Sequence, residues 1–235
     1  MKKIHRFIGN YQLGQGTMRI DDDELAHQMR SVLKLQPGEM VIIGDGQGNE
    51  AQCHIISYDD DIVLLEGLSV GRNALELSGR TILYCAVLKN DNFELAAAKA
   101  TEVGISEIVP LVTKRTIKLN LRLERVQKIV QEAAELARRG LIPIIQPVQE
   151  FERVLTPACK NDINFFFDPS GKPFSGVATS VRQAGIFIGP EGGWEEEEIE
   201  AAKKVGMRIV SLGGLIMRAE TAVVVGSFLV AHRMK

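Results

Sequence analysis

The sequence predicts an α/β protein with two parts: a small β-rich N-terminal unit, followed by a larger parallel sheet with helices on both faces. Residues 4–70 hold short apolar runs separated by tight turns, a pattern typical of small barrels. From Arg80 onward, short apolar runs alternate with helical periodicity, which is typical of a parallel sheet covered by helices. The 235 residues are 45% hydrophobic and 25% charged, which is enough to build a core in each part.

The N-terminal unit, residues 1–72, is expected to contain four strands and one helix. Asp21-Asp-Asp-Glu-Leu opens the helix, because its acidic side chains can cap the first turn, and Pro37-Gly38 marks the exit turn. Gly44-Asp-Gly-Gln-Gly-Asn49 predicts a hairpin between two of the strands. The strands are expected over residues 4–8, 40–43, 51–57 and 62–65. Some small barrels of this kind hold RNA, although most do not.

The second part, residues 73–235, is expected to form the parallel sheet. Its last helix, residues 221–232, is apolar nearly all round, so it must be buried against the sheet or against a second subunit, and we favour the subunit. The other expected elements are strands over residues 82–88, 105–112, 142–145, 163–167 and 186–188, and helices over residues 91–103, 120–139 and from Glu195 onward.

The charge pattern predicts a local basic surface on a chain whose formal net charge is −2. Basic residues outnumber acidic ones along the long helix, and RNA phosphates are their natural counterpart. The alternative is a solvated helix face with pairs of opposite charge one turn apart. The basic residues are Lys114, Arg115, Lys118, Arg122, Arg125, Lys128, Arg138 and Arg139, against Glu124, Glu132 and Glu135.

Several classes of protein are disfavoured by the sequence. Cys53, Cys85 and Cys159 lie far apart without a C-x-x-C pair, so we expect reduced thiols, neither a disulfide framework nor a metal site. No apolar segment follows the charged residues 1–7, and no window approaches the length of a membrane span. We therefore expect a cytoplasmic protein without metal or membrane partners.

The sequence predicts a ligand site in residues 186–222. The apolar run Ile186-Phe-Ile188, the turn Gly189-Pro-Glu-Gly-Gly193 and the acidic helix start Glu195-Glu-Glu-Glu198 read as strand, loop and helix. Four carboxylates in a first helical turn repel a polyphosphate, and both the P-loop and the G-x-G-x-x-G fingerprint are missing. A nucleoside without phosphates fits better. The alternative is a plain turn whose glutamates only complement the helix dipole.

The same residues resemble a known family. Gly189-Pro-Glu-Gly-Gly193, Ser211-Leu-Gly213 and Ile216-Met-Arg-Ala-Glu-Thr-Ala222 look like the signature of the SPOUT-type methyltransferases, and more narrowly of the RsmE family. His5-Arg-Phe7 and the segments 99–110 and 132–139 agree, so the resemblance covers essentially the whole chain. The family methylates N3 of a uridine in small-subunit ribosomal RNA with S-adenosylmethionine.

The resemblance implies a PUA-like N-terminal barrel, a trefoil-knotted C-terminal domain, and a homodimer with active sites at the subunit interface. Its motif positions imply that S-adenosylmethionine binds among Gly189, Pro190, Glu191, Gly192, Leu212, Gly213, Ile216, Met217 and Arg218. The expected partners are ribosomal RNA or the small ribosomal subunit.

The chemistry of the reaction suggests roles for charged residues. Deprotonation of uracil N3 spreads negative charge onto O2 and O4, which a guanidinium stabilises, and we assign this role to Arg218 with Arg139 as second candidate. Glu220 is expected to accept the proton or to orient Arg218, unless it is only an intrachain partner of that arginine. Contacts with RNA phosphates are assigned to Arg6, Arg115, Arg122 and Arg125.

Two departures from the family pattern bear on the substrate. Ala219 stands where the family usually has Thr, and Leu136-Ala137 where it has a Gln-Ser pair. Three other functions stay open: methylation of another RNA such as transfer RNA, RNA binding in ribosome assembly without catalysis, and a nucleotide-dependent enzyme, which the acidic first turn disfavours.

Overall fold

The chain forms two compact units in the computed structural model, which describes residues 4–117 and 120–234. The first unit comprises the chain up to Glu76 together with Ala134–Ile142. The second comprises Leu77–Ala133 and the chain from Pro143 on. The domain limits expected from the sequence were 1–72 and 73–235. They assign Ala134–Ile142 to the second part, whereas this segment groups with the first unit.

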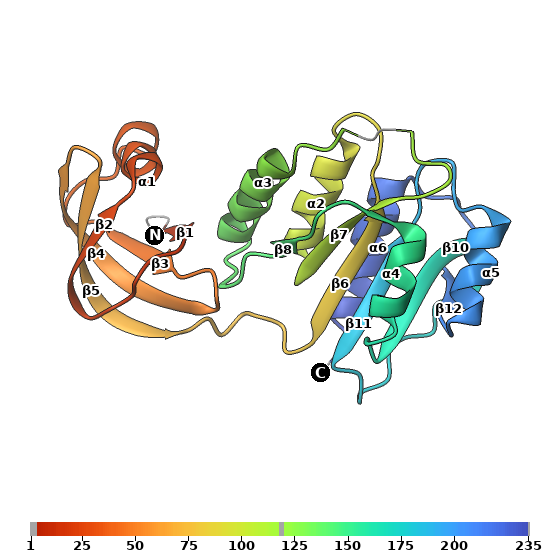
Figure 1. Cartoon of the computed structure of the whole chain (residues 1–235). Coiled ribbons are helices and arrows are strands. Elements are labelled where there is room, and N and C mark those ends of the chain that lie inside the picture. Colours follow the sequence, from red (N-terminus) through yellow and green to blue (C-terminus); the bar gives the residue numbers. More distant parts are fainter. Residues whose placement is uncertain (1–3, 118–119, 235) are drawn as a thin grey trace. The chain divides into compact units, whose positions relative to one another are not determined.

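The first unit is a five-stranded sheet in the order β1-β3-β4-β5-β2, with one short helix (Figure 1). Only β1 and β3 pair in parallel. The helix α1 (Asp23–His27) begins as expected, since Asp22 accepts the Leu25 N–H at 2.9 Å, and it continues into the π-helical turn η1 (Gln28–Val32). The strands are β1 (His5–Ile8), β2 (Gly16–Asp21), β3 (Met40–Gly44), β4 (Asn49–Asp59) and β5 (Ile62–Arg72).

The prediction of four strands in this unit was one too few. The strand that it lacked, β2, has only two buried apolar side chains, Met18 and Ile20, at alternate positions. Two positions are too few to establish a period of two. Phe7, Met29, Val41 and Ile43 lie at the centre of this unit's core.

The second unit contains a parallel sheet in the order β12-β10-β11-β6-β7-β8, with β9 also pairing with β7. Every strand pair in it is parallel, as the alternation of apolar runs and helices predicted. The strands are β6 (Arg80–Ala86), β7 (Glu107–Val112), β8 (Ile144–Ile145), β9 (Gln149–Glu150), β10 (Ile163–Pro173), β11 (Gln183–Ile188) and β12 (Arg208–Ser211).

Helices cover both faces of this sheet, as predicted (Figure 1). The helices α4 (Phe151–Ala158) and α5 (Glu196–Lys204) share one apolar cluster with Tyr84, Phe166 and Phe187. On the other face, α6 (Ala219–Ala231) packs against α2 (Asn92–Glu102), β6 and β11. The remaining helix is α3 (Leu123–Leu136). Among the described residues, no helix combines the length and apolar character needed to cross a membrane.

The sequence did not predict α4, β9 or β12. The helix α4 has eight residues and contains Pro157, which weakens a helical signal, and β9 and β12 have two and four residues. One side of the apolar helix α6 is buried against α2, β6 and β11 of its own chain. From the sequence we favoured burial of this helix against a second subunit. Phe228, on the other side of α6, is 49% exposed.

Candidate functional site

A pocket of about 610 Å³ lies at the carboxyl ends of the parallel strands in the second unit. Gly189 follows β11, Leu212 follows β12, and Asp168 lies where the pairing of β10 with β12 is interrupted. Asn92, at the start of α2, completes the wall on the β6 side. Parallel sheets bind ligands at this edge, because the loops after several strands meet there.

The residues expected from the sequence to hold a cofactor all line this pocket. They come from two loops, one after β11 and one between β12 and α6, which the fold brings together from distant parts of the sequence. The nine are Gly189, Pro190, Glu191, Gly192, Leu212, Gly213, Ile216, Met217 and Arg218.

The backbone of the first loop is fixed by close packing and by a turn that favours glycine. A Cβ atom at Gly189 would lie 2.9 Å from the indole ring of Trp194, so only glycine fits there. Trp194 is buried and donates its indole N–H to the Phe167 carbonyl at 3.2 Å. Gly193 has φ +72°, in the left-handed region. The packing of Trp194 and the turn at Gly193 therefore hold the loop in one conformation.

The charged groups of the pocket favour a cationic ligand. Three carboxylates, of Asp168, Glu191 and Glu220, line it together with one cation, Arg218. Glu191 accepts the Lys89 N–H at 2.8 Å, whereas the Oε2 atom of Glu220 is buried without a hydrogen-bond partner. A buried carboxylate oxygen without a partner is costly, so the charge of a cation in the pocket would stabilise this carboxylate.

Arg218 and Glu220, both proposed from the sequence as catalytic, stand together at the start of α6. The Arg218 side chain is 87% exposed, and its Nη1 atom lies 4.0 Å from Oε1 of Glu220. The side chain of Glu220 is only 17% exposed. Arg218 is thus held weakly, and its guanidinium can reach a ligand outside the pocket.

The basic residues from the end of β7 into the first turn of α3 differ from one another in their contacts. Arg115 donates to the Gly192 carbonyl at 2.7 Å and to the Glu195 carboxylate at 2.8 Å. Its hydrogen bond with Glu195 raises the pKa of Arg115 and lowers that of Glu195. Arg125 lies 3.6 Å from Asp91, and Arg122 is exposed. Lys118 lies outside the described residues.

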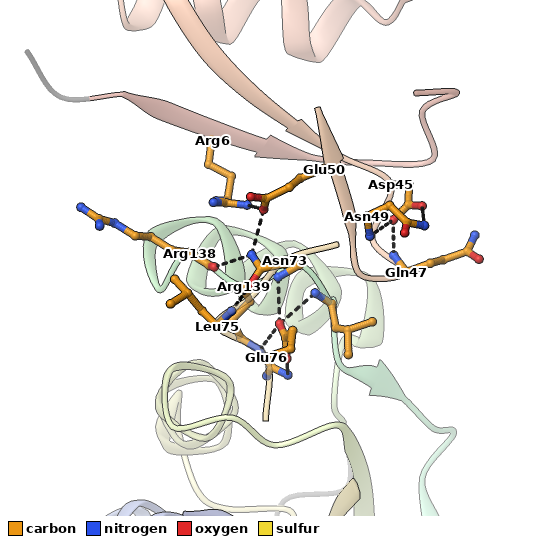
Figure 2. A network of polar contacts seen from close by, with 12 residues as sticks. Arg6, Asp45, Gln47, Asn49, Glu50, Asn73, Leu75, Glu76, Arg138 and Arg139 are labelled. Atoms are coloured by element: carbon orange, nitrogen blue, oxygen red, sulfur yellow. Dashed lines mark hydrogen bonds and ion pairs between the residues drawn. The ribbon is translucent and has the colours of Figure 1, made fainter. Parts of the chain in front are cut away.

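Two further arginines, Arg6 and Arg139, belong to the first unit and are largely buried there (Figure 2). The Arg6 side chain is 8% exposed and forms an ion pair with Glu50. The Arg139 side chain is 7% exposed and bonds Glu76 at 3.1 and 3.3 Å. Neither guanidinium faces solvent, so an RNA contact by Arg6 or a catalytic role for Arg139 would require these ion pairs to open.

Sequence reasoning missed several residues of the pocket wall, among them Asn92, Phe167 and Asp168. The rule that selected Gly189, a polar or turn residue directly after an apolar strand, applies equally to Asp168 after the run ending at Phe167. Asn92 carried no comparable signal, because it is one of four consecutive polar residues, 89–92, around the start of the helix. In the described part of the chain, no cluster of three or more His, Cys, Asp or Glu residues could hold a metal ion.

Two segments of the chain match models of known protein families. The model of the RNA methyltransferase domain matches residues 75–230, and that of an RNA methyltransferase PUA domain matches residues 20–66. The chain belongs to this RNA methyltransferase family. The resemblance seen in residues 186–222, the α/β fold class and the PUA-like N-terminal unit are thereby confirmed.

Relatives in the family carry a more specific name. The "Ribosomal RNA small subunit methyltransferase E" of Synechocystis sp. is 34% identical over 224 residues, covering 90% of this chain and 71% of the relative. The protein of the same name from Bacillus subtilis is 28% identical and covers 88% and 86%. The structure of the Neisseria gonorrhoeae protein bound to S-adenosyl methionine has a TM-score of 0.87 at 25% identity, covering 96% and 95%.

Proposed function

We propose that this RNA methyltransferase transfers the methyl group of S-adenosylmethionine to N3 of a uridine in the ribosomal RNA of the small subunit. The observation that carries the proposal is the acidic pocket at the carboxyl ends of the sheet, lined by nine residues of the family's motif positions. Its relatives bear the name of ribosomal RNA small subunit methyltransferases, and one of them is described with S-adenosyl methionine bound.

The pocket fits the proposed methyl donor in charge and size. A volume of about 610 Å³ is in the usual range for small-molecule sites. S-adenosylmethionine carries a sulfonium and an ammonium group but no phosphate, and the three carboxylates of Asp168, Glu191 and Glu220 suit such a cation. When bound, this cofactor supplies a methyl group activated by the positive sulfur.

The residues of this chain would hold the donor and handle the uridine proton. Gly189, Gly192 and Gly213 line the pocket and carry no side chain of their own, so a flat ligand can approach their backbone groups closely. Arg218 would stabilise the negative charge that develops on O2 and O4 as N3 loses its proton. Glu220, whose side chain is 17% exposed beside Arg218, would accept that proton or orient Arg218. N3 lies on the pairing edge, so the base must be unpaired.

RNA contacts are proposed for the exposed basic residues of the second unit. Arg122 and Arg125 remain our candidates for phosphate binding, since Arg122 is exposed and the Arg125 ion pair is long at 3.6 Å. Arg6 and Arg115 are weaker candidates, because each has an ion-pair partner. The PUA-like unit would supply further RNA contacts.

A homodimer in the cytoplasm is the state in which we propose that the enzyme acts. Large apolar side chains stand exposed on α2, on α6 and beside the pocket: Leu95 is 48%, Phe228 49% and Ile216 88% exposed. A second copy would remove this surface from water and add its own groups near the pocket. Light scattering on the purified chain measures the mass: twice 25.9 kDa is expected, and a single chain mass would contradict the dimer.

Calorimetric titration tests the choice of methyl donor without knowledge of the RNA. We expect S-adenosylmethionine and its demethylated product to bind, and ATP and NAD not to bind. Binding of ATP or NAD alone would contradict the proposal. Methylation of a transfer RNA and not of ribosomal RNA would contradict the substrate assignment, and RNA binding without donor binding would indicate a non-catalytic protein.

A further inference from the structure

We propose that Arg115 is a positioning residue of the methyl-donor pocket, holding the 189–195 loop in its binding shape. This replaces the phosphate contact expected from its place in a basic segment. The proposal rests on the proposed function in one respect, namely that S-adenosylmethionine occupies the pocket formed by this loop.

The contacts of Arg115 are directed at the loop backbone and at the helix start that follows it. Its Nη1 donates to the Gly192 carbonyl at 2.7 Å and its Nε to Oε1 of Glu195 at 2.8 Å. One guanidinium thus connects the glycine turn with Glu195, the N-cap residue of α5. A planar group with donors in a fixed fork is suited to this, whereas a lysine has one nitrogen to place.

The aliphatic part of Arg115 also packs behind the glycines. A Cβ atom at Gly192 would lie 3.4 Å from its Cδ, and one at Gly193 would lie 4.0 Å from its Nη1. Gly192 and Gly193 line the donor pocket. Displacement of the Arg115 side chain therefore leaves the outer side of this pocket wall without support.

Neighbouring contacts fix the chain segment from which Arg115 projects. The backbone N–H of Lys114 donates to the buried Glu198 carboxylate at 3.1 Å, and the same carboxylate accepts the Glu195 N–H at 2.8 Å. The Lys114 side chain pairs with Glu197. Lys114, which follows β7, thus contacts two adjacent residues of α5, Glu197 and Glu198. These contacts fix the chain beside Arg115 and place its guanidinium over the loop.

The test measures donor affinity and RNA affinity separately on the full-length chain. Arg115→Ala is expected to weaken S-adenosylmethionine binding by about tenfold, with RNA affinity changed by less than about twofold. Arg115→Lys, which keeps the charge and one of the two bonds, is expected to lie between Arg115→Ala and the wild type. In turnover, KM for the donor should rise more than kcat falls.

Two control variants separate positioning from general loss of charge. Arg153→Ala removes an exposed ion pair between Arg153 on α4 and Glu150 at the end of β9, and it should leave donor affinity unchanged. Arg122→Ala removes an exposed cation of the same basic segment and should weaken RNA binding alone.

Two results would overturn the inference, given that the wild type binds the donor. One is a donor affinity of Arg115→Ala within twofold of the wild type. The other is a loss confined to RNA affinity, with the salt dependence reduced by about one phosphate contact. A wild type that fails to bind the donor would instead refute the proposed function. Thermal unfolding of each variant checks that the fold is intact.

Discussion

The guanidinium of Arg139 donates to the Glu76 carboxylate at 3.1 and 3.3 Å, and both side chains are largely buried in the first unit. The same carboxylate accepts the backbone N–H groups of Gly140 and Leu141 at 2.8 and 3.0 Å (Figure 2). Nearby, Asn73 donates to Glu50 and to the Arg138 carbonyl. These bonds hold the returning segment Ala134–Ile142 within the first unit, so we assign Arg139 a structural role ahead of its proposed catalytic one.

Glu76 is expected to make the first unit sensitive to acid. Burial alone would raise the pKa of Glu76, but the Arg139 bond and the two backbone N–H groups outweigh it, so the pKa is lowered. A lowered carboxyl pKa stabilises the fold above the unfolded value of about 4.3, and this stabilisation is lost as the pH falls through the folded value. Glu76→Gln should therefore lower the free energy of unfolding at pH 7 by about 1 to 3 kcal/mol.

Denaturant unfolding at pH 7 and pH 4 measures this effect. The difference between wild type and Glu76→Gln should shrink at the lower pH. The exposed Glu150→Gln serves as the control and should change little at either pH. A Glu76→Gln difference that stays constant between the two pH values would contradict the account.

A methyl group at Gly189 is expected to damage the donor pocket. The added Cβ would lie 2.9 Å from the buried Trp194 ring, which a hydrogen bond to Phe167 holds in place. Overpacking of this kind costs about 1 to 3 kcal/mol, so Gly189→Ala should weaken donor binding by roughly tenfold or more. Gly214→Ala, whose Cβ meets nothing within 4 Å, is the matched control. Equal donor affinity of the two variants in calorimetry would refute the packing argument.

Glu220 is expected to contribute to donor binding through charge. Its Oε2 atom is buried in the pocket wall without a partner, and a cationic donor would relieve that cost. Glu220→Gln keeps the shape but removes the charge, so the affinity for S-adenosylmethionine should fall by roughly three- to tenfold. Affinity for a neutral adenosine fragment should stay unchanged. A similar loss for both ligands would assign Glu220 a packing role.

Arg122 and Arg125 are expected to bind RNA phosphates. Removal of both cations should weaken RNA binding and reduce the slope of log affinity against log salt by roughly one to two units. Filter binding at several salt concentrations measures that slope. The donor affinity of Arg122→Ala/Arg125→Ala serves as the internal control and should equal that of the wild type. An unchanged salt slope would exclude these residues from the RNA interface.

The sequence predicted the central strands of the second unit most clearly. The apolar runs ending at Phe167 and Ile188 are buried over most of their length, and such runs have a strong sequence signal. The nine pocket residues were found from the motif positions of the family that the chain resembles, whereas the strand-loop-helix pattern alone indicated only the loop after Ile188. In contrast, β2 and α4 were missed because short elements and an internal proline leave little periodicity.

The roles of the arginines could not be predicted from the sequence. Arg6, Arg115 and Arg139 all stand in basic or motif segments, and their partners Glu50, Glu195 and Glu76 lie between 44 and 80 residues away in the sequence. Whether a cation faces solvent or an ion-pair partner depends on such long-range contacts. Local charge patterns therefore overestimate the RNA-binding surface.

The most direct test of the account is methyl transfer to small-subunit ribosomal RNA from S-adenosylmethionine, followed by mass spectrometry of the digested nucleosides. The wild type should produce 3-methyluridine, and Arg218→Ala should lose about 100-fold or more of the rate while keeping donor affinity and fold. Methylation of another atom or base, or unchanged turnover by a folded Arg218→Ala, would contradict the account.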